Sequence, residues 1–203
     1  TDMVIEEEVW TVFTWELQLP VDTPFGDYAA SVRACDRSGN EVIAQSPDFT
    51  VRVCSARVTV QLQQWNDDQA HSVPVTVWFT DVEGNTLETR TVEAAICPCD
   101  GDEPGVGTLQ VGGVPPETAH VSAKAPFTLR KRLDLEFDET GNASACFVDS
   151  NQLLAGDFNG DNRINMLDFV ILRDHWMSVC PDADANGDGV VNTLDFVLER
   201  DNW

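Results

Sequence analysis

Residues 184–196 read DANGDGVVNTLDF, and residues 157–169 read DFNGDNRINMLDF. Aligning Asp157 with Asp184 makes 12 of 20 positions identical across DFNGDNRINMLDFVILRDHW and DANGDGVVNTLDFVLERDNW. Chance does not produce this agreement, so the two copies are an internal duplication. After each loop the apolar residues of MLDFVILRDHWM and TLDFVLERDNW recur every three or four positions, which predicts a helix in each copy.

Both loops carry the oxygen atoms that calcium requires. A 12-residue calcium loop supplies ligands from positions 1, 3, 5, 9 and 12 and from the backbone carbonyl at position 7, with a sharp bend at position 6. Gly189 stands at that bend in the second copy, and Asn162 in the first, where asparagine also adopts left-handed conformations. Magnesium fits less well because it demands tight octahedral geometry. The sequence therefore predicts two calcium ions. Their predicted ligands are Asp157, Asn159, Asp161, the carbonyl of Arg163, Asn165 and Asp168, and then Asp184, Asn186, Asp188, the carbonyl of Val190, Asn192 and Asp195.

The details of these loops differ from an EF-hand. Position 12 is Asp instead of Glu, and the preceding segments NQLLAG and SVCPDA are too short for a full helix. With the DxNxDGxVNxxD pattern and its second copy, residues 155–203 resemble a type I dockerin. We expect a small core from Phe169, Leu172, Trp176, Phe196, Val197 and Trp203, with Ile164 and Val191 bridging the loops.

The resemblance implies a calcium-folded docking module that binds a cohesin domain. In that family the partner contacts cluster at loop positions 10 and 11 and further along the helix. At positions 10 and 11 this chain has Met-Leu and Thr-Leu, which are more apolar than the hydroxyl pairs of many cellulosomal dockerins. A standard cellulosomal cohesin is therefore in doubt, and the alternative is that these side chains pack on the chain's own β-sandwich. The implied contacts are Met166, Leu167, Arg173, Asp174, Thr193, Leu194, Arg200 and Asp201.

The residues before 150 alternate apolar and polar side chains with period two, which predicts antiparallel strands. The fold is thus expected to be mostly β: two small antiparallel β-sandwich units at 1–55 and 56–150, followed by a small α-helical calcium-binding unit at 151–203. No low-complexity linker separates the units, so we expect them to be packed together. The first unit has about three strand candidates where an immunoglobulin-like sandwich needs about seven. It must complete its sheet from the preceding MVIEEEV segment, from the next domain or from a strand of another molecule.

Two further resemblances concern these β units. The segments VPVTVWF, GVPPETAHVSAKAP and LRKRLDLEF resemble transthyretin-like or carboxypeptidase-regulatory-like sandwiches that precede dockerins in secreted bacterial proteins. LPVDTPFGDYAASVRACDRSGN similarly resembles part of an immunoglobulin-like bacterial surface domain.

The six cysteines form an even set without zinc-ligand spacing, which predicts disulfides in an oxidising compartment. Six cysteines permit 15 pairings. Strands 27–36 and 49–54 both place their cysteine on the outer face, which favours Cys35–Cys54. The cysteines are Cys35, Cys54, Cys97, Cys99, Cys146 and Cys180. Asn142-Ala-Ser144 is a glycosylation sequon, with an unmodified turn as the equal alternative.

The composition excludes several functions. The chain carries 35 acidic and 12 basic residues, so nucleic acid is not an expected partner. It has no apolar run of membrane-spanning length, and it begins with Thr as a processed chain or fragment would. His71, His120 and His175 lie in unrelated segments and match no catalytic motif, so no enzyme is expected.

These observations predict a secreted, extracellular or cell-surface structural or adhesive protein that acts by assembly. Two modes compete, and self-assembly into a head-to-tail filament is slightly favoured over docking to a cohesin on another protein. A third alternative is a glycan-binding module, for which Trp10, Trp65 and Trp78 are the exposed candidates.

Overall fold

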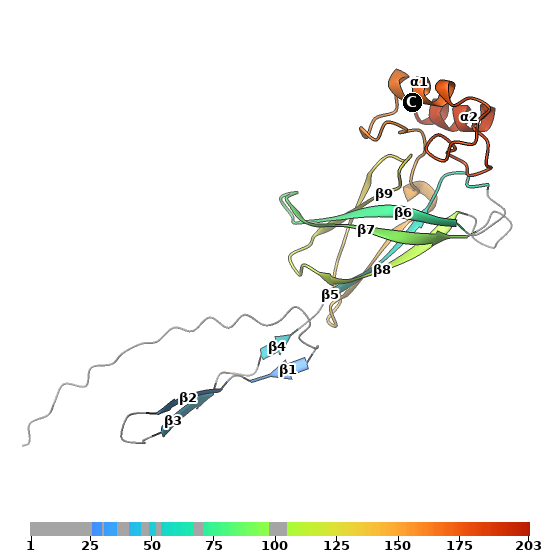
Figure 1. The fold of residues 1–203 in the computed structure, drawn as a ribbon. Coiled ribbons are helices and arrows are strands. Elements are labelled where there is room, and N and C mark those ends of the chain that lie inside the picture. Colours follow the sequence, from blue (N-terminus) through green and yellow to red (C-terminus); the bar gives the residue numbers. More distant parts are fainter. Residues whose placement is uncertain are drawn as a thin grey trace, which may run out of the picture. The chain divides into compact units, whose positions relative to one another are not determined.

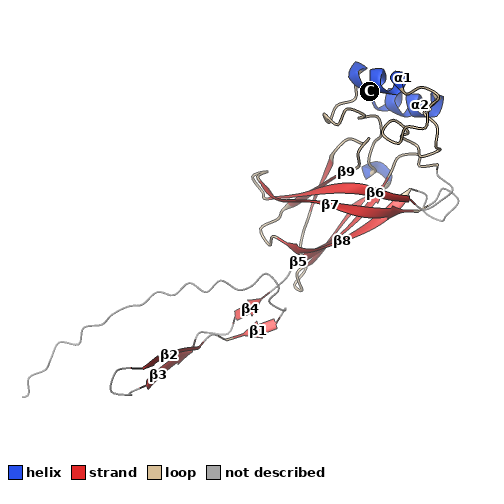
Figure 2. Cartoon of the chain, in the orientation of Figure 1, coloured by secondary structure: helices blue, strands red, loops and turns tan. Residues whose placement is uncertain are grey.

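The computed structural model describes residues 26–29, 31–35, 41–45, 49–51, 54–66, 71–97 and 105–203. The chain divides into two compact units, residues 1–51 and residues 52–203. Figure 1 traces the chain, and Figure 2 shows that its helices lie in the C-terminal part.

The described residues of the first unit form two antiparallel strand pairs. β1 (Gly26–Tyr28) pairs with β4 (Phe49–Val51), and β2 (Ser31–Cys35) pairs with β3 (Glu41–Gln45). The single strand expected over 27–36 is therefore two strands. The segment MVIEEEV and the residue Trp10 lie outside the described residues.

The second unit begins with a sandwich of two sheets. One sheet has the order β10-β9-β6-β7 and the other β11-β5-β8. Every pair is antiparallel except β11 with β5, which are parallel. The strands are β5 (Cys54–Gln61), β6 (His71–Thr80), β7 (Thr86–Ile96), β8 (Val106–Val114), β9 (His120–Lys124), β10 (Lys131–Asp134) and β11 (Asn142–Phe147). The prediction of a mostly β fold with a small helical part is confirmed.

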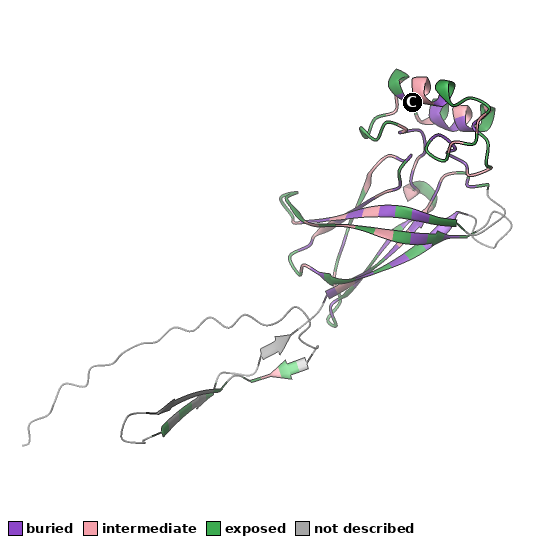
Figure 3. Ribbon diagram, in the orientation of Figure 1, coloured by how far each residue is buried: buried purple, intermediate pink, exposed green. Residues whose placement is uncertain are grey.

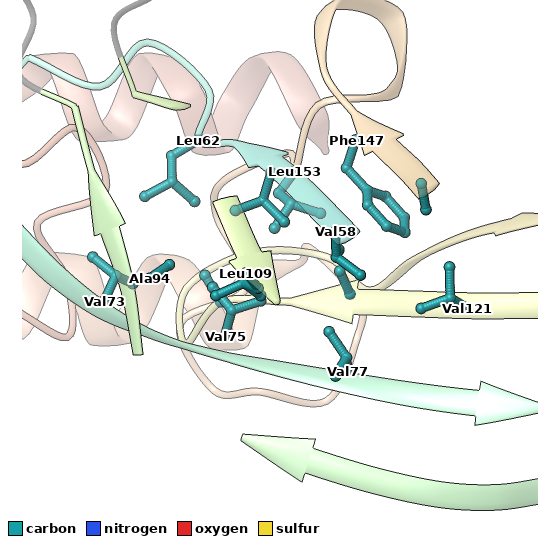
Figure 4. Packing of buried hydrophobic residues seen from close by; sticks show 14 of the residues in the cluster. Val58, Leu62, Val73, Val75, Val77, Ala94, Leu109, Val121, Phe147 and Leu153 are labelled. Atoms are coloured by element: carbon teal, nitrogen blue, oxygen red, sulfur yellow. The ribbon is translucent and has the colours of Figure 1, made fainter. Parts of the chain in front are cut away.

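Alternating side chains build the core between these sheets. Val58 of β5 and Val75 and Val77 of β6 are fully buried, whereas the residues between them are partly or fully exposed. Figure 3 shows this alternation along the strands, and Figure 4 shows side chains from both sheets meeting in one cluster. Each such side chain contributes about 1.5–3 kcal/mol when it leaves water.

The segment after the sandwich stays attached to it. Beyond the 3-10 helix η1 (Asp149–Asn151), Leu153 forms a parallel bridge with Leu62, and Ala155 an antiparallel bridge with Thr128. Leu153 and Ala155 are fully buried in the sandwich core. The expected packing of the helical part on the sandwich is therefore observed.

Two short helices follow, and each begins at a loop residue. α1 (Met166–Asp174) is capped by Asn165 and α2 (Thr193–Asn202) by Asn192, both within capping boxes. Among the described residues, no helix has the length and apolar character to cross a bilayer.

Candidate metal centre

The first loop places a buried carboxylate at its start. Asp157 is 0% exposed, and its Oδ2 accepts a hydrogen bond from the Asn162 backbone N–H at 2.8 Å. Asn162 has φ +66°, the left-handed conformation expected at position 6. The other oxygen of Asp157, Oδ1, is buried without a hydrogen-bond partner within the described residues. An unpaired buried oxygen costs about 1–3 kcal/mol, so a cation ligated there would remove a destabilising feature.

Asp168 links this loop to its helix. One of its oxygens accepts the Asn159 backbone N–H at 3.0 Å and the other accepts the Asn165 backbone N–H at 2.9 Å. Asn165 in turn caps α1 by accepting the Leu167 backbone N–H. Loop positions 9 and 12 are therefore also the cap and the third residue of the helix.

The second loop repeats this arrangement. Asp184 accepts the backbone N–H groups of Gly187 and Gly189 at 2.9 and 2.8 Å. Asp195 accepts those of Ala185 and Asn192, both at 2.8 Å. Gly189 has φ +86°, which a residue with a side chain rarely adopts.

The second loop concentrates negative charge. Burial raises the pKa of Asp184, and the neighbouring carboxylates of Asp195 and Asp188 raise it further, against the backbone donors that lower it. Burial also raises the pKa of Asp195, with Asp188 adding to the shift. A divalent cation relieves both the burial cost and the repulsion.

The donor set of both loops fits a hard cation. Its carboxylate, amide and carbonyl oxygens are the ligands that calcium prefers. In the described part of the chain, no cluster of three or more His, Cys, Asp or Glu side chains is preformed. The predicted ligand set also includes asparagine side chains and backbone carbonyls, so only part of it consists of acidic side chains. The calcium coordination itself remains a prediction.

Two charged residues near the first loop escaped the sequence analysis. Lys124, at the end of β9, forms an ion pair with Asp157 Oδ2 and donates to the Gly160 carbonyl at 3.3 Å. Glu199 of α2 is 0% exposed. In the sequence, Lys124 is distinguished as the one lysine within the apolar stretch VSAKAPF. Glu199 is distinguished because it aligns with Leu172 in the other copy.

The residues implied as partner contacts are all exposed. Arg173 forms an ion pair with its neighbour Asp174, and Arg200 with Asp201, each at 2.6 Å. Met166, Leu167 and Leu194 have exposed fractions of 58%, 60% and 52%. Thr193 is exposed as well. Leu194 borders a hollow that is also lined by Gln64, Trp65 and Asn66 of the segment after β5, so it lies at the edge of the contact with the sandwich.

The small helical core differs from its prediction. Trp176 and Trp203 are 43% and 57% exposed. Trp176 follows the end of α1 at Asp174, and Trp203 follows the end of α2 at Asn202, so neither lies on the buried stripe of its helix. The core consists instead of Leu172, Ala183 and Val191, with Phe158, Ile171, Cys180 and Phe196 at its edge. Phe169 packs edge-on against Phe196 at 5.7 Å, while Ile164 and Val197 are half-buried.

The expected exposure of Trp65 is wrong. Trp65 is 8% exposed, stacks on Phe127 at 6.4 Å and lies directly against Gly187 of the second loop. An added Cβ at Gly187 would stand 2.8 Å from its ring. Trp78 is half-buried beneath the Arg130 guanidinium, 4.2 Å from the ring centre. Neither indole offers the open aromatic surface that the glycan-binding alternative needs.

The outward placement of Cys54 is also wrong. Cys54 is 6% exposed, because it belongs to β5 and shares the inward face of Ala56, Val58 and Val60. Among the described residues, Cys97, Cys146 and Cys180 carry free thiols. The Cys35 side chain and Cys99 lie outside the description. Asn142 is exposed at the start of β11, and its modification stays a prediction.

The comparisons with known proteins assign the duplicated segment. Residues 155–198 match the dockerin type I domain. The dockerin resemblance is confirmed for this segment, and dockerin domains bind calcium and are non-catalytic modules. The transthyretin-like and immunoglobulin-like resemblances stay predictions.

No curated protein matches the chain. Among solved structures, the crystal structure of BcpA, the major pilin subunit of Bacillus cereus, matches with 10% sequence identity and a TM-score of 0.25. The match covers 63% of this chain and 33% of that one, so this chain spans about a third of the pilin's length. At this level of similarity no property is transferred from the pilin.

Proposed function

We propose that the chain is a secreted, non-enzymatic docking protein whose dockerin domain binds a cohesin-like domain on another protein when calcium is present. The dockerin match at residues 155–198 supports this class of function. The observation that carries the proposal for this chain is the exposure of the contact positions on both helices, together with the packing of the rest of the domain on the sandwich.

Calcium would act by ordering the start of each helix. Asp168 and Asp195 are predicted ligands, and both already accept the backbone N–H of a helix-capping asparagine. Holding these carboxylates therefore fixes Leu167 and Leu194, which lie within the first turns. An ion that binds only the folded form stabilises it by about 2.7 kcal/mol per site at a hundredfold excess over its dissociation constant.

The chemistry of the exposed surface favours an apolar partner surface. Arg173 and Arg200 are each neutralised by the aspartate that follows them. Of the four remaining side chains, Met166, Leu167 and Leu194 present apolar area whose removal from water is favourable, and Thr193 supplies a single hydroxyl. A cohesin that recognises hydroxyl pairs would leave this area unused.

Surface plasmon resonance against a panel of purified cohesin domains tests this function. We expect binding in millimolar calcium and none in EDTA. The double variant Leu167→Asp/Leu194→Asp should weaken binding at least ~tenfold, since it places charge in an apolar contact. Val82→Asp is the matched control, because Val82 is 77% exposed on a sandwich turn remote from the helices.

Light scattering on the same samples separates the competing mode of assembly. The predicted self-assembling filament has no support from the comparisons, and it requires a mass well above 22.4 kDa in calcium. If the chain forms calcium-dependent oligomers and binds no cohesin, its docking partner is a second copy of the chain. A monomer that binds no cohesin in calcium would refute the docking function.

A further inference from the structure

Glu199 of α2 is a buried carboxylate that no described residue stabilises by a hydrogen bond. The residue is 0% exposed, and both of its oxygens lack a hydrogen-bond partner within the described residues. Burying an ionised carboxylate without a counter-charge is strongly unfavourable. Its position therefore calls for a nearby positive charge.

The duplication shows what the same position holds in the other copy. Leu172 aligns with Glu199 and is fully buried against Ala183 and Val191, which belong to the opposite repeat. The matching residues on the other side are Gly156 and Ile164. A Cβ added at Gly156 would stand 3.0 Å from the Glu199 Cα and 3.1 Å from the Ile164 Cδ1, so Glu199 occupies the equivalent place.

The surroundings of Glu199 belong to the first loop. Gly156 immediately precedes Asp157, whose Oδ1 is buried and unpartnered. Burial and, as the smaller cause, the charge of Asp168 together raise the pKa of Glu199 to about 7. Lys124 pairs with the opposite oxygen of Asp157, whereas Arg163 of the same loop is exposed. Three carboxylates thus share this region with one ammonium group.

We propose that Glu199 is the charge partner of the cation in the first loop, supplied across the repeat boundary by α2. Calcium held by Asp157 and Asp168 provides the positive charge that Glu199 lacks, and Glu199 in turn strengthens the hold on that ion. The second loop has no counterpart, since Leu172 stands at the equivalent position. The two ions are therefore unequal: the first stabilises both repeats, and the second stabilises mainly its own. This inference rests on calcium binding as proposed above.

Isothermal titration calorimetry of calcium binding to the full chain tests the proposal in two backgrounds. Asp184→Ala disables the second loop, so that the first is titrated alone, and Asp157→Ala does the reverse. Glu199→Leu is then added to each, because leucine is the residue that the fold already accepts at the matching position. We expect Glu199→Leu to weaken the first loop on the order of tenfold, since it removes a nearby opposite charge. The second loop should keep its affinity.

Several results would overturn the proposal. An unchanged first-loop affinity in Asp184→Ala/Glu199→Leu would do so, as would an equal loss in both backgrounds, which would indicate a packing defect. Glu199→Gln keeps the shape and removes the charge, and it must reproduce the loss if Glu199→Leu folds poorly by circular dichroism. Failure of the unmodified chain to bind any calcium would instead refute the proposed function, and this inference with it.

Discussion

At the scale of single residues, the ion pair between Lys124 and Asp157 is the contact that connects the sandwich to the first loop by charge. Lys124 comes from β9, and its side chain is 14% exposed, while Asp157 is fully buried. The ammonium group holds one oxygen of Asp157 and leaves the other available to an ion. The sandwich therefore supplies part of the charge balance of a loop that lies outside it.

Replacing Lys124 by Met should destabilise the protein more in EDTA than in calcium. Without calcium, Asp157 keeps its buried charge and loses its partner, which costs about 3–5 kcal/mol. With calcium, the ion compensates the same carboxylate and the loss should shrink. Guanidinium unfolding in both conditions measures the difference.

Lys131→Met is the control for this prediction. Lys131 lies on the neighbouring strand β10 and donates to the Ser150 carbonyl, away from both loops. Its variant should lose little stability, and equally in both conditions. Equal losses for Lys124→Met in EDTA and calcium would mean that the ion does not act on Asp157.

At the scale of elements, the loops and their helices could be predicted because their signals are local. The positions of Asp157 and Asp184, the left-handed residue and the helix-capping asparagines all follow from spacing along the chain. The helix ends could not be placed as well, since the apolar pattern runs on to Trp176 although α1 ends at Asp174.

Contacts between elements were beyond the local patterns. Lys124 contacts Asp157 of the first loop although the two residues are 33 positions apart in the sequence. Trp65 lies near the start of the second unit in sequence and packs against Gly187 near its end. The predicted outward orientation of Cys54 assumes one continuous strand from Phe49. The observed orientation is inward because β4 ends at Val51 and a new strand, β5, begins at Cys54. A period-two pattern predicts that side chains alternate between the two faces of a strand. Which residues face inward depends on where the strand begins.

A prediction at this scale concerns the cap of α2. Asn192→Ala removes the side chain that accepts the Leu194 backbone N–H, and should cost about 1 kcal/mol even in EDTA. Since Asn192 is also a predicted ligand at position 9, the calcium affinity of the second loop should fall in addition. Thermal unfolding by circular dichroism and calorimetric titration measure the two effects.

Thr193→Ala provides the comparison, because Thr193 is the adjacent, exposed residue and is no part of the cap. It should change neither quantity. A variant Asn192→Ala with reduced stability but full calcium affinity would remove Asn192 from the ligand set and leave it as a cap alone.

At the scale of the whole molecule, the dockerin domain and the sandwich share one core. Ala185 of the second loop and Leu198 of α2 belong to the same buried cluster as the valines of β5 and β6. The Asn66 backbone N–H donates to the Asn186 carbonyl, and the Asn202 side-chain amide donates to the Gln63 side-chain oxygen at 2.5 Å. The proposed docking surface is thus joined to the sandwich through a shared core.

Because of this shared core, the sandwich and the dockerin domain should unfold together, and Trp65 is the residue on which this depends most. Trp65→Ala removes a buried ring that touches both Phe127 and Gly187, and should cost about 3–5 kcal/mol. Calorimetry in calcium should show one main transition for residues 52–203 in the unmodified chain and two in Trp65→Ala, with only the dockerin transition shifted by EDTA. Phe147→Ala is the control, since it removes a large ring that is fully buried in the sandwich on β11, and it should leave a single transition. If Trp65→Ala still unfolds in a single calcium-dependent transition, the two parts are coupled through the segment around Leu153 and Ala155, and the Trp65 contact is not what joins them.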